Sequence, residues 1–380
     1  MRRNVVVGPT VVDVVVVVMI GDSVSLAPPS SSPHDAAAIA STVATAPTVA
    51  SHSRDRIRRI VGVAGRDAAV SSAPMPSPLV SFTGAHAPDR RDRVMCGDVG
   101  ITTYEWGPVD GPPLLVVHGG FDFARTFDVF APLLAAAGWR VVGFDQRGHG
   151  DSDHVELYSW DADIRDAMAV LDHVADGRPI PVVGHSKGGS MMVQLADAQP
   201  YRFSHLVNID GIPYQRRIPD VAEHVRTKMM ASEITAWLDH RRRTAGATRR
   251  PGTIDELAAR RGRMNPRLSL EWLRYLVTVG AREDADGWRW KIDPSMRFGG
   301  FGPWRPEWTV LRLPGLPMPF LAVFGTEPEE MGWGTEPRSV LSYLPADGRA
   351  EILDGVGHFV HIERPHRVAE LVLDVVGSPT

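Results

Sequence analysis

The sequence predicts an α/β fold: a mostly parallel central sheet with helices on both faces and an inserted helical cap. Short apolar runs typical of buried strands alternate with stretches of helical apolar spacing from about residue 94 onward. After residue 210 the pattern changes to polar, Arg-rich helices, and a strand-like run returns near residue 319. An insertion at this point would lie over the mouth of a site between strand ends, so residues 211–313 are expected to form a lid.

The individual elements follow from the same patterns. Strands are predicted at residues 114–117, 141–144, 180–183, 206–209, 319–325 and 349–353. Apolar residues at helical spacing predict crossover helices over residues 127–134 and 164–174, and a final helix begins at Pro365. Strands alternating with helices favour parallel pairing, because a crossover helix returns the chain to the same edge of the sheet.

Ser186 lies at the centre of the most informative motif. Residues 184–188 read Gly-His-Ser-Lys-Gly, directly after the run 180–183 and before the helix-like stretch 189–196. A serine at a strand-to-helix turn between two glycines is typical of a nucleophile elbow, in which the hydroxyl projects from a strained turn. The glycines leave room where side chains would collide. Ser186 is therefore the predicted nucleophile.

A serine nucleophile needs a base, and His358 is the predicted one. It lies in a Gly-rich loop between the last strand-like run and the last helix, and Gly357 precedes it. Such a loop can carry an imidazole over the edge of the sheet. The nearby His361 is the residue most easily confused with it. Because His361 is close to Glu363 and Arg364, we expect it to lie on a solvated surface.

Two backbone N–H groups are the predicted donors to an oxyanion. The strand at residues 114–117 ends in His-Gly-Gly-Phe at 118–121, where glycine lets the main chain approach a substrate carbonyl closely. The expected donors are the N–H of Gly120 and that of Lys187, the residue after the nucleophile.

A further Gly-rich turn covers residues 145–152, after the strand at 141–144. Its His149 and Asp151 are residue types that catalysis uses. We interpret them as structural, holding the turn together with Arg147.

These motifs occur in the order and spacing of the α/β-hydrolase superfamily. The chain resembles that superfamily over roughly residues 90–378, and residues 253–293 are similar to the cap of its serine-hydrolase-like branch. The resemblance implies the α/β-hydrolase fold and a serine hydrolase of the carboxylic-ester type. It does not name a substrate.

The chain departs from the superfamily pattern at the acid. Relatives commonly carry an Asp three residues past the glycine at the end of the strand 319–325, but here that residue is Pro328. Others use the end of the preceding strand, where this chain has Asp210. We favour Asp210, with Glu327 or Glu329 as the alternative acid, because both strands end at the edge where the nucleophile emerges. Asp210 could instead cap its turn through Asx geometry.

Composition narrows the class of protein. With 380 residues, 43% of them hydrophobic, the chain can bury an α/β core and a cap. A net charge of −4 provides no overall basic field for nucleic acid. The single cysteine, Cys96, excludes an intrachain disulfide, and no histidines or carboxylates have metal-ligand spacing. We expect no metal, no cofactor, no stable membrane insertion and a small-molecule substrate as the partner.

The first 80 residues differ from the rest. Val, Ala, Ser and Pro dominate residues 1–80 without sustained periodicity, which predicts a disordered extension. The apolar run 14–20 has the position of a secretory signal, but Asp13 and Pro28 argue against one. We expect a cytoplasmic protein, with secretion or a tether through residues 1–27 as the alternative.

The expected organisation is then an extension over residues 1–80, a core in two parts at 81–210 and 314–380, and a cap at 211–313. The expected activity is hydrolysis of an ester-type bond in a small, fairly apolar substrate, through an acyl-enzyme on Ser186. The alternatives are a cofactor-free lyase or acyltransferase using the same residues, and a non-catalytic receptor of the same fold.

Overall fold

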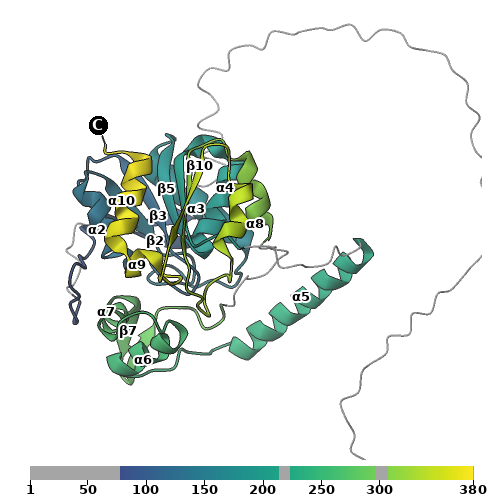
Figure 1. The fold of residues 1–380 in the computed structure, drawn as a ribbon. Coiled ribbons are helices and arrows are strands. Elements are labelled where there is room, and N and C mark those ends of the chain that lie inside the picture. Colours follow the sequence, from purple (N-terminus) through teal and green to yellow (C-terminus); the bar gives the residue numbers. More distant parts are fainter. Residues whose placement is uncertain (1–77, 214–222, 297–306, 380) are drawn as a thin grey trace, which may run out of the picture. The chain divides into compact units, whose positions relative to one another are not determined.

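The computed structural model describes residues 78–213, 223–296 and 307–379. Eight strands form one sheet in the order β1-β2-β4-β3-β5-β6-β9-β10 (Figure 1). In that order they are β1 (Arg90–Cys96), β2 (Val99–Trp106), β4 (Arg140–Phe144), β3 (Pro113–Val117), β5 (Ile180–His185), β6 (Phe203–Ile209), β9 (Phe320–Gly325) and β10 (Gly348–Leu353). β2 pairs antiparallel with both neighbours, and every pairing from β4 to β10 is parallel. The predicted mostly parallel sheet is confirmed.

Helices cover both faces of this sheet (Figure 1). The α-helices of the core are α2 (Phe130–Ala136), α3 (Trp160–Ala175), α4 (Lys187–Ala198), α8 (Glu307–Arg312), α9 (Val360–Glu363) and α10 (Pro365–Val376). Short 3-10 helices are η1 (Ala124–Phe127), η2 (Pro200–Arg202), η3 (Leu313–Gly315) and η4 (Pro337–Tyr343). The predicted helix at residues 127–134 is thus divided into η1 and α2.

The side chains of β3 show why helices pack on both faces of the sheet. Leu115 and Val117 join the apolar cluster that contains α3, α4 and α8, whereas Leu114 and Val116 join the cluster that contains α2 and α10. Successive side chains of a strand point to opposite faces, so a strand that is apolar throughout needs helices on both sides. The carboxyl ends of the parallel strands therefore remain as the edge where a site can form.

The inserted segment after β6, called the cap below, shares its apolar cluster with Phe123 and Phe359 of the core. It comprises α5 (Glu223–Thr244), α6 (Ile254–Met264), α7 (Leu270–Gly280) and the antiparallel hairpin of β7 (Ala281–Asp284) and β8 (Gly287–Trp290). Leu257 of α6 packs with Trp272 and Leu276 of α7, and all three are buried. A capping box at Thr253 begins α6, and the Ser269 hydroxyl caps α7. The cap predicted as helical therefore also contains a strand pair.

The predicted end of the cap at residue 313 needs a correction. Val310 of α8 and Leu313 are fully buried in the cluster that lies between the sheet and α4. The polar, Arg-rich pattern after residue 210 placed these residues in the insertion, but the apolar side of α8 packs on the core. Among the described residues, the second part of the core therefore begins at Glu307. Residues 214–222 and 297–306 of the predicted cap lie outside the described residues.

The chain is described from residue 78, so most of the predicted extension lies outside the described residues. Just after this point, Phe82 packs edge-on against Trp272 of the cap, with ring centroids 4.9 Å apart. The Trp106 indole N–H donates a hydrogen bond to the carbonyl of His86 (3.1 Å). The segment before β1 is thus attached to both core and cap.

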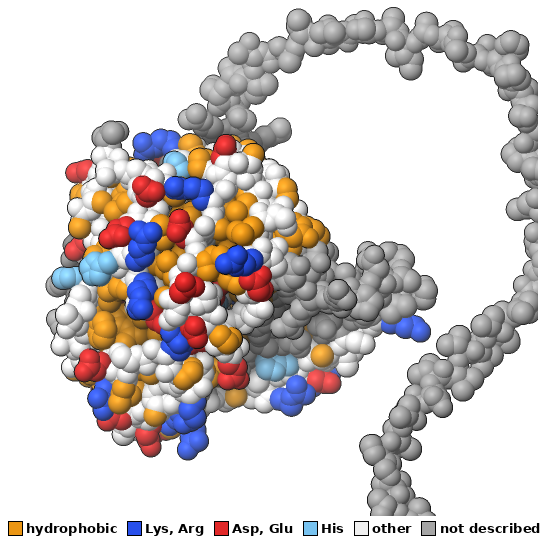
Figure 2. Space-filling view, viewed as in Figure 1, with side chains coloured by type: hydrophobic (Ala, Val, Ile, Leu, Met, Phe, Trp, Pro, Cys, Tyr) orange, Lys and Arg blue, Asp and Glu red, His pale blue; other side chains and the backbone are white. Residues whose placement is uncertain are grey.

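Acidic and basic side chains are interspersed over the face seen in Figure 2, with apolar side chains between them. This mixture agrees with the small net charge of the chain. Within the described part of the chain, none of the helices has both the length and the apolar character needed to cross a membrane.

Candidate active site

Ser186 connects β5 to α4 in a backbone conformation that few residues other than glycine adopt, with φ 51° and ψ −122°. The flanking glycines explain how the turn fits. A Cβ on Gly188 would lie 2.5 Å from the carbonyl oxygen of Val117, and one on Gly184 would lie 2.7 Å from the backbone of Gly189. The strain is held by the sheet, because the Ser186 N–H donates to the carbonyl of Ile209 (2.9 Å).

Three of the predicted site residues form one hydrogen-bonded chain. The His358 Nε2 lies 2.9 Å from the Ser186 Oγ, and its Nδ1 lies 2.6 Å from the Asp210 Oδ2. Ser186 and His358 are buried, with 6% and 3% of their surfaces exposed. The loop after β10 thus brings His358 to two residues that are 148 and 172 positions away in sequence.

Asp210 lies in a turn that the side chains of Asn208 and Ser190 stabilise. Its φ is 44°, and its N–H donates to the carbonyl of Val323 on β9 (2.8 Å). The Asn208 Oδ1 accepts the N–H of Gly211 (2.8 Å), and the Ser190 hydroxyl donates to the Gly211 carbonyl (2.7 Å). The side chain that closes this turn is therefore that of Asn208, which leaves the Asp210 carboxylate directed at His358.

The alternative acids lie elsewhere. Glu329 accepts the backbone N–H of His358 at 2.6 Å, so it contacts the main chain of that residue and the imidazole is bound by Asp210. Burial raises the pKa of the Glu329 carboxyl above its usual range. Glu327 is exposed, and its N–H donates to the carbonyl of Val356.

The expectation that His361 lies on a solvated surface is wrong. Its side chain is fully buried, with its ring against Phe127 (centroids 5.0 Å apart) and His185 (4.5 Å). Burial lowers the pKa of His361 to about 3, so the ring is neutral. The charged neighbours in sequence suggested exposure, but α9 is a single turn that directs His361 inward while Glu363 bonds the N–H of Gly357.

The two predicted oxyanion donors lie beside the nucleophile. Gly120 and Ser186 line the same cavity, and a Cβ on Gly119 would lie 3.0 Å from the Ser186 Cβ. Lys187 is the first residue of α4. The N–H groups of a first helical turn have no acceptor within the helix, and they carry the positive end of its dipole.

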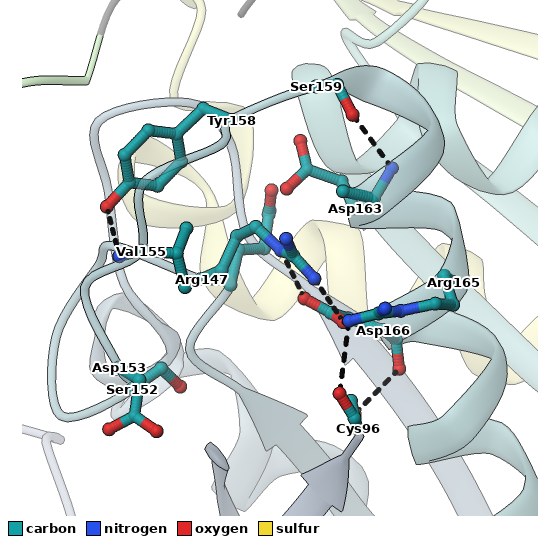
Figure 3. Close-up of polar contacts among 12 residues, drawn as sticks. Cys96, Arg147, Ser152, Asp153, Val155, Tyr158, Ser159, Asp163, Arg165 and Asp166 are labelled. Carbon is teal, nitrogen blue, oxygen red and sulfur yellow. Dashed lines mark hydrogen bonds and ion pairs between the residues drawn. The ribbon is translucent and has the colours of Figure 1, made fainter. Parts of the chain in front are cut away.

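The turn at residues 145–152 is anchored to α3, as the sequence analysis expected of a structural element. Figure 3 shows the Arg147 guanidinium reaching Asp166, with Nε–Oδ2 at 2.6 Å and Nη2–Oδ1 at 2.7 Å. The two side chains are 5% and 1% exposed. The imidazole Nδ1 of His149 lies 3.1 Å from the Arg147 carbonyl. Asp151 binds the Lys291 ammonium and the Tyr104 hydroxyl.

His149 has a second contact that the sequence did not suggest. Its Nε2 accepts the backbone N–H of Phe121 at 3.1 Å, so the turn also supports the loop that contains Gly120. Burial lowers the pKa of His149 well below its usual value, which keeps Nε2 available as an acceptor. Periodicity and motifs gave no signal for a contact between residues 28 positions apart.

A cavity of about 300 Å³ opens over Ser186. Its walls are mainly apolar: Phe121 and Phe359 from the core, Met264 from α6, and Met331 and Trp333 from the loop after β9. A second cavity of about 330 Å³ is lined by Asp210 and His358. His358, Gly332 and Trp333 line both cavities.

Comparisons with known proteins identify the family of the chain. The sequence model described as the alpha/beta hydrolase family matches residues 114–371, which is more than half of the chain. The chain therefore belongs to the α/β-hydrolase family, and the predicted family and fold are confirmed.

Curated relatives share part of the chain. A serine hydrolase-like protein of Dictyostelium discoideum is 33% identical over 122 residues, which is 30% of this chain and 33% of that protein. An sn-1-specific diacylglycerol lipase of Xenopus laevis is 32% identical over 117 residues, 30% of this chain and 37% of the lipase. The chain thus matches about a third of the length of these relatives.

A solved structure extends the likeness in fold. The thioesterase domain from the curacin biosynthetic pathway superposes with a TM-score of 0.63 at 23% identity, covering 75% of this chain and 98% of that domain.

Proposed function

We propose that this protein is a serine hydrolase that cleaves a carboxylic ester of a small, fairly apolar acid through an acyl-enzyme on Ser186. The observation that supports it most strongly is the chain of two hydrogen bonds, 2.6 and 2.9 Å long, from Asp210 through His358 to Ser186. A carboxylate, an imidazole and a hydroxyl in this order are the arrangement by which a serine is activated.

The geometry leads to a two-step reaction. His358 Nε2 takes the Ser186 proton as Oγ attacks the ester carbonyl, and Asp210 stabilises the imidazolium that forms. The imidazolium then gives this proton to the departing alcohol, which leaves an acyl group on Oγ. Water, deprotonated by His358, attacks that acyl group, and collapse of the second tetrahedral intermediate returns the proton to Oγ and releases the acid.

The backbone N–H groups of Gly120 and Lys187 are the proposed donors to the oxyanion of each tetrahedral intermediate. Both residues adjoin the nucleophile, and the Lys187 N–H has no acceptor within α4 because it lies in the first turn. Donors held by the backbone need no reorganisation when the charge develops.

The cavity supports the choice of substrate. Its volume of about 300 Å³ and its walls of Phe121, Met264 and Trp333 suit a short apolar acyl group. The names of the curated relatives, which include a diacylglycerol lipase and a protein phosphatase methylesterase, support an ester as the bond cleaved.

The test combines active-site labelling with turnover. The full chain is treated with a fluorophosphonate probe and assayed with p-nitrophenyl esters of two to twelve acyl carbons. We expect labelling at Ser186 and the highest kcat/KM among the shorter esters. Ser186→Ala should abolish labelling and lower kcat by about 10⁴- to 10⁶-fold with the fold retained. Ser204→Ala, at the start of β6 and remote from the site, is the matched control.

Two results would contradict the proposal. Turnover that persists in Ser186→Ala would remove the nucleophile assignment. A wild-type protein that is not labelled and cleaves no ester, but binds the esters, would favour a receptor of the same fold.

A further inference from the structure

The loop that contains Gly120 is held by side chains at three successive peptide groups. The Gly119 carbonyl accepts from the His118 Nδ1 (2.7 Å), the Phe121 N–H donates to the His149 Nε2 (3.1 Å), and the Phe121 carbonyl accepts from the Arg261 Nη1 (2.9 Å). The His118 Nε2 accepts the N–H of Gln146 (2.9 Å), which makes Nδ1 the protonated nitrogen. Each peptide unit is planar, so a contact to one of its atoms fixes the direction of the others.

The direction of the Gly120 N–H follows from these contacts. That N–H shares a peptide plane with the Gly119 carbonyl and points the opposite way, because the peptide is trans. The following planes must then turn sharply, and Phe121 has a φ of 56°, which is costly for an aromatic residue. Such a conformation persists only where the surroundings hold it.

Arg261 differs from the other two side chains because it comes from the cap. It lies on α6, 140 positions after Phe121, whereas His118 and His149 belong to the core. Its side chain is 9% exposed, and its Nη2 lies 3.7 Å from an oxygen of the buried Asp122. Its guanidinium carbon lies 5.8 Å from the centroid of Phe359, the residue after His358.

Arg261 and Asp122 are oppositely charged groups that are both buried beside the loop. Burial raises the pKa of Asp122 to about 6, and the nearby Arg261 opposes that rise. Burying a guanidinium is costly unless it gains close partners. The Phe121 carbonyl is the hydrogen-bond acceptor of this guanidinium, whose Nε and Nη2 have no hydrogen-bond partner among the described residues. The Asp122 carboxylate lies 3.7 Å away and the Phe359 ring centroid 5.8 Å away.

We propose that Arg261 is a positioning residue through which the cap holds the oxyanion loop in its donor geometry. The inference rests on the proposed function, since it assigns the Gly120 N–H to the oxyanion. It predicts that the cap contributes to stabilising the transition state without contacting the reacting atoms.

The experiment compares Arg261→Met with Arg263→Met, which removes an exposed arginine from the same helix. Both are assayed with p-nitrophenyl butyrate, normalised to sites titrated with the fluorophosphonate. Each is also inhibited with an alkyl trifluoromethyl ketone, which forms an oxyanion on the serine, and with the matching methyl ketone, which remains a neutral carbonyl ligand.

For Arg261→Met we expect kcat per titrated site to fall about 10- to 100-fold, less than the loss of a whole oxyanion donor. The affinity for the trifluoromethyl ketone should fall by the same factor. KM and the affinity for the methyl ketone should stay within about threefold, because the ground state makes little use of the donor. Arg263→Met should match wild type. Unchanged kcat per site and unchanged trifluoromethyl ketone affinity would overturn the proposal.

A double variant tests whether the effect comes from leaving the Asp122 carboxylate unpaired. Arg261→Met leaves the Asp122 carboxylate buried without its partner, so Arg261→Met/Asp122→Asn removes that charge as well. The double variant should show the same selective loss. If it regains wild-type kcat, the effect belongs to the unpaired charge and the positioning role is wrong.

Hydrogen exchange separates this inference from the proposed function. In Arg261→Met the Phe121 amide should exchange about tenfold faster than in wild type. Without the contact from Arg261 to the Phe121 carbonyl, the hydrogen bond from the Phe121 N–H to His149 should open more often. If that occurs while wild type neither labels nor hydrolyses esters, the proposed function fails and the contact role stands. If wild type is active and neither exchange nor kcat responds, the inference alone fails.

Discussion

The two halves of the candidate site are supported by different sets of contacts. Ser186, Asp210 and His358 are held by the ends of β5, β6 and β9 and by the loop after β10, through backbone bonds to Ile209 and Val323. The loop of residues 118–122 has supports from the core and one from the cap. The loop after β10 contacts the cap as well, since the Arg267 guanidinium donates to the Gly355 carbonyl (2.5 Å). We expect the proposed oxyanion donor Gly120 to depend more directly on the insertion, because Arg261 contacts Phe121, the residue that follows it.

Because the two halves have different supports, a substitution can affect one half more than the other. A substitution in α6 can alter the loop of residues 118–122 while leaving the Asp210–His358–Ser186 chain intact. A substitution at the strand ends affects that chain first. Variants in both halves should therefore lower kcat, but by different factors.

The largest effect is expected in the strand-end half, from Asp210→Asn. The substitution keeps the shape but favours the wrong tautomer of His358, and we expect kcat to fall by about 10⁴-fold with little change in Tm. Glu329→Gln should be mild, because an amide oxygen can still accept the His358 N–H, and Glu327→Gln should have no effect. Steady-state kinetics on the three variants measures the ranking, and a larger loss in Glu329→Gln would move the orienting acid to that residue.

The support that the core gives to the loop of residues 118–122 is tested by measuring the free energy of unfolding. Arg147 and Asp166 are buried partners, and breaking such a pair costs about 3–5 kcal/mol. Urea unfolding of Arg147→Met should show this loss, while Arg165→Met, half exposed beside the same carboxylate, should change the free energy of unfolding by less than about 1 kcal/mol. Equal losses in both variants would mean that the buried pair does not anchor the turn that carries His149.

The buried Asp122 carboxyl should make the free energy of unfolding depend on pH. The pKa of Asp122 is raised from 3.8 to about 6 by burial, so the folded chain binds this proton more tightly than the unfolded chain. Its contribution to the free energy of unfolding is therefore greatest near pH 4 and falls, by about 3 kcal/mol, as the pH rises to about 6. Above that pH it is constant.

The measurement is a comparison with Asp122→Asn, which lacks this titration. The stability of wild type minus that of the variant should decrease between pH 4 and 6 and level off above. A difference that grows with pH would mean that pairing with Arg261 outweighs burial.

The smallest effects are expected from deletions before β1. Removing residues 1–77 should leave Tm and kcat unchanged, because their composition lacks the periodicity needed to pack on a core. Extending the deletion through residue 89 removes Phe82 from Trp272 and the His86 carbonyl from Trp106, and should cost about 1–2 kcal/mol. Differential scanning calorimetry distinguishes the two deletions. A large decrease in Tm on removing residues 1–77 would show that they stabilise the core.

Local patterns were sufficient for the framework of the site. The run at 180–183, the two glycines around Ser186 and the helix that follows are all encoded within a few positions, so the turn could be predicted without knowing the rest of the chain. The same holds for the strands that lead to residues 118 and 145. Boundaries were less certain, since α8 shows helical spacing whether its apolar side meets the cap or the core.

Three features were decided only by tertiary packing. Asp210 and Glu329 both follow strands that end beside His358, and the difference between binding the ring and binding the backbone is a matter of where a folded loop places each carboxylate. His361 has charged neighbours in sequence, yet a single helical turn directs it inward. Arg261 meets Phe121 across 140 positions, and no periodicity reports the distance between residues so far apart. The sequence by itself predicted the proposed nucleophile, the hydrolase class and the sheet, because those depend on short-range pattern. The contacts of Ser186 with distant residues depend on how separate segments pack.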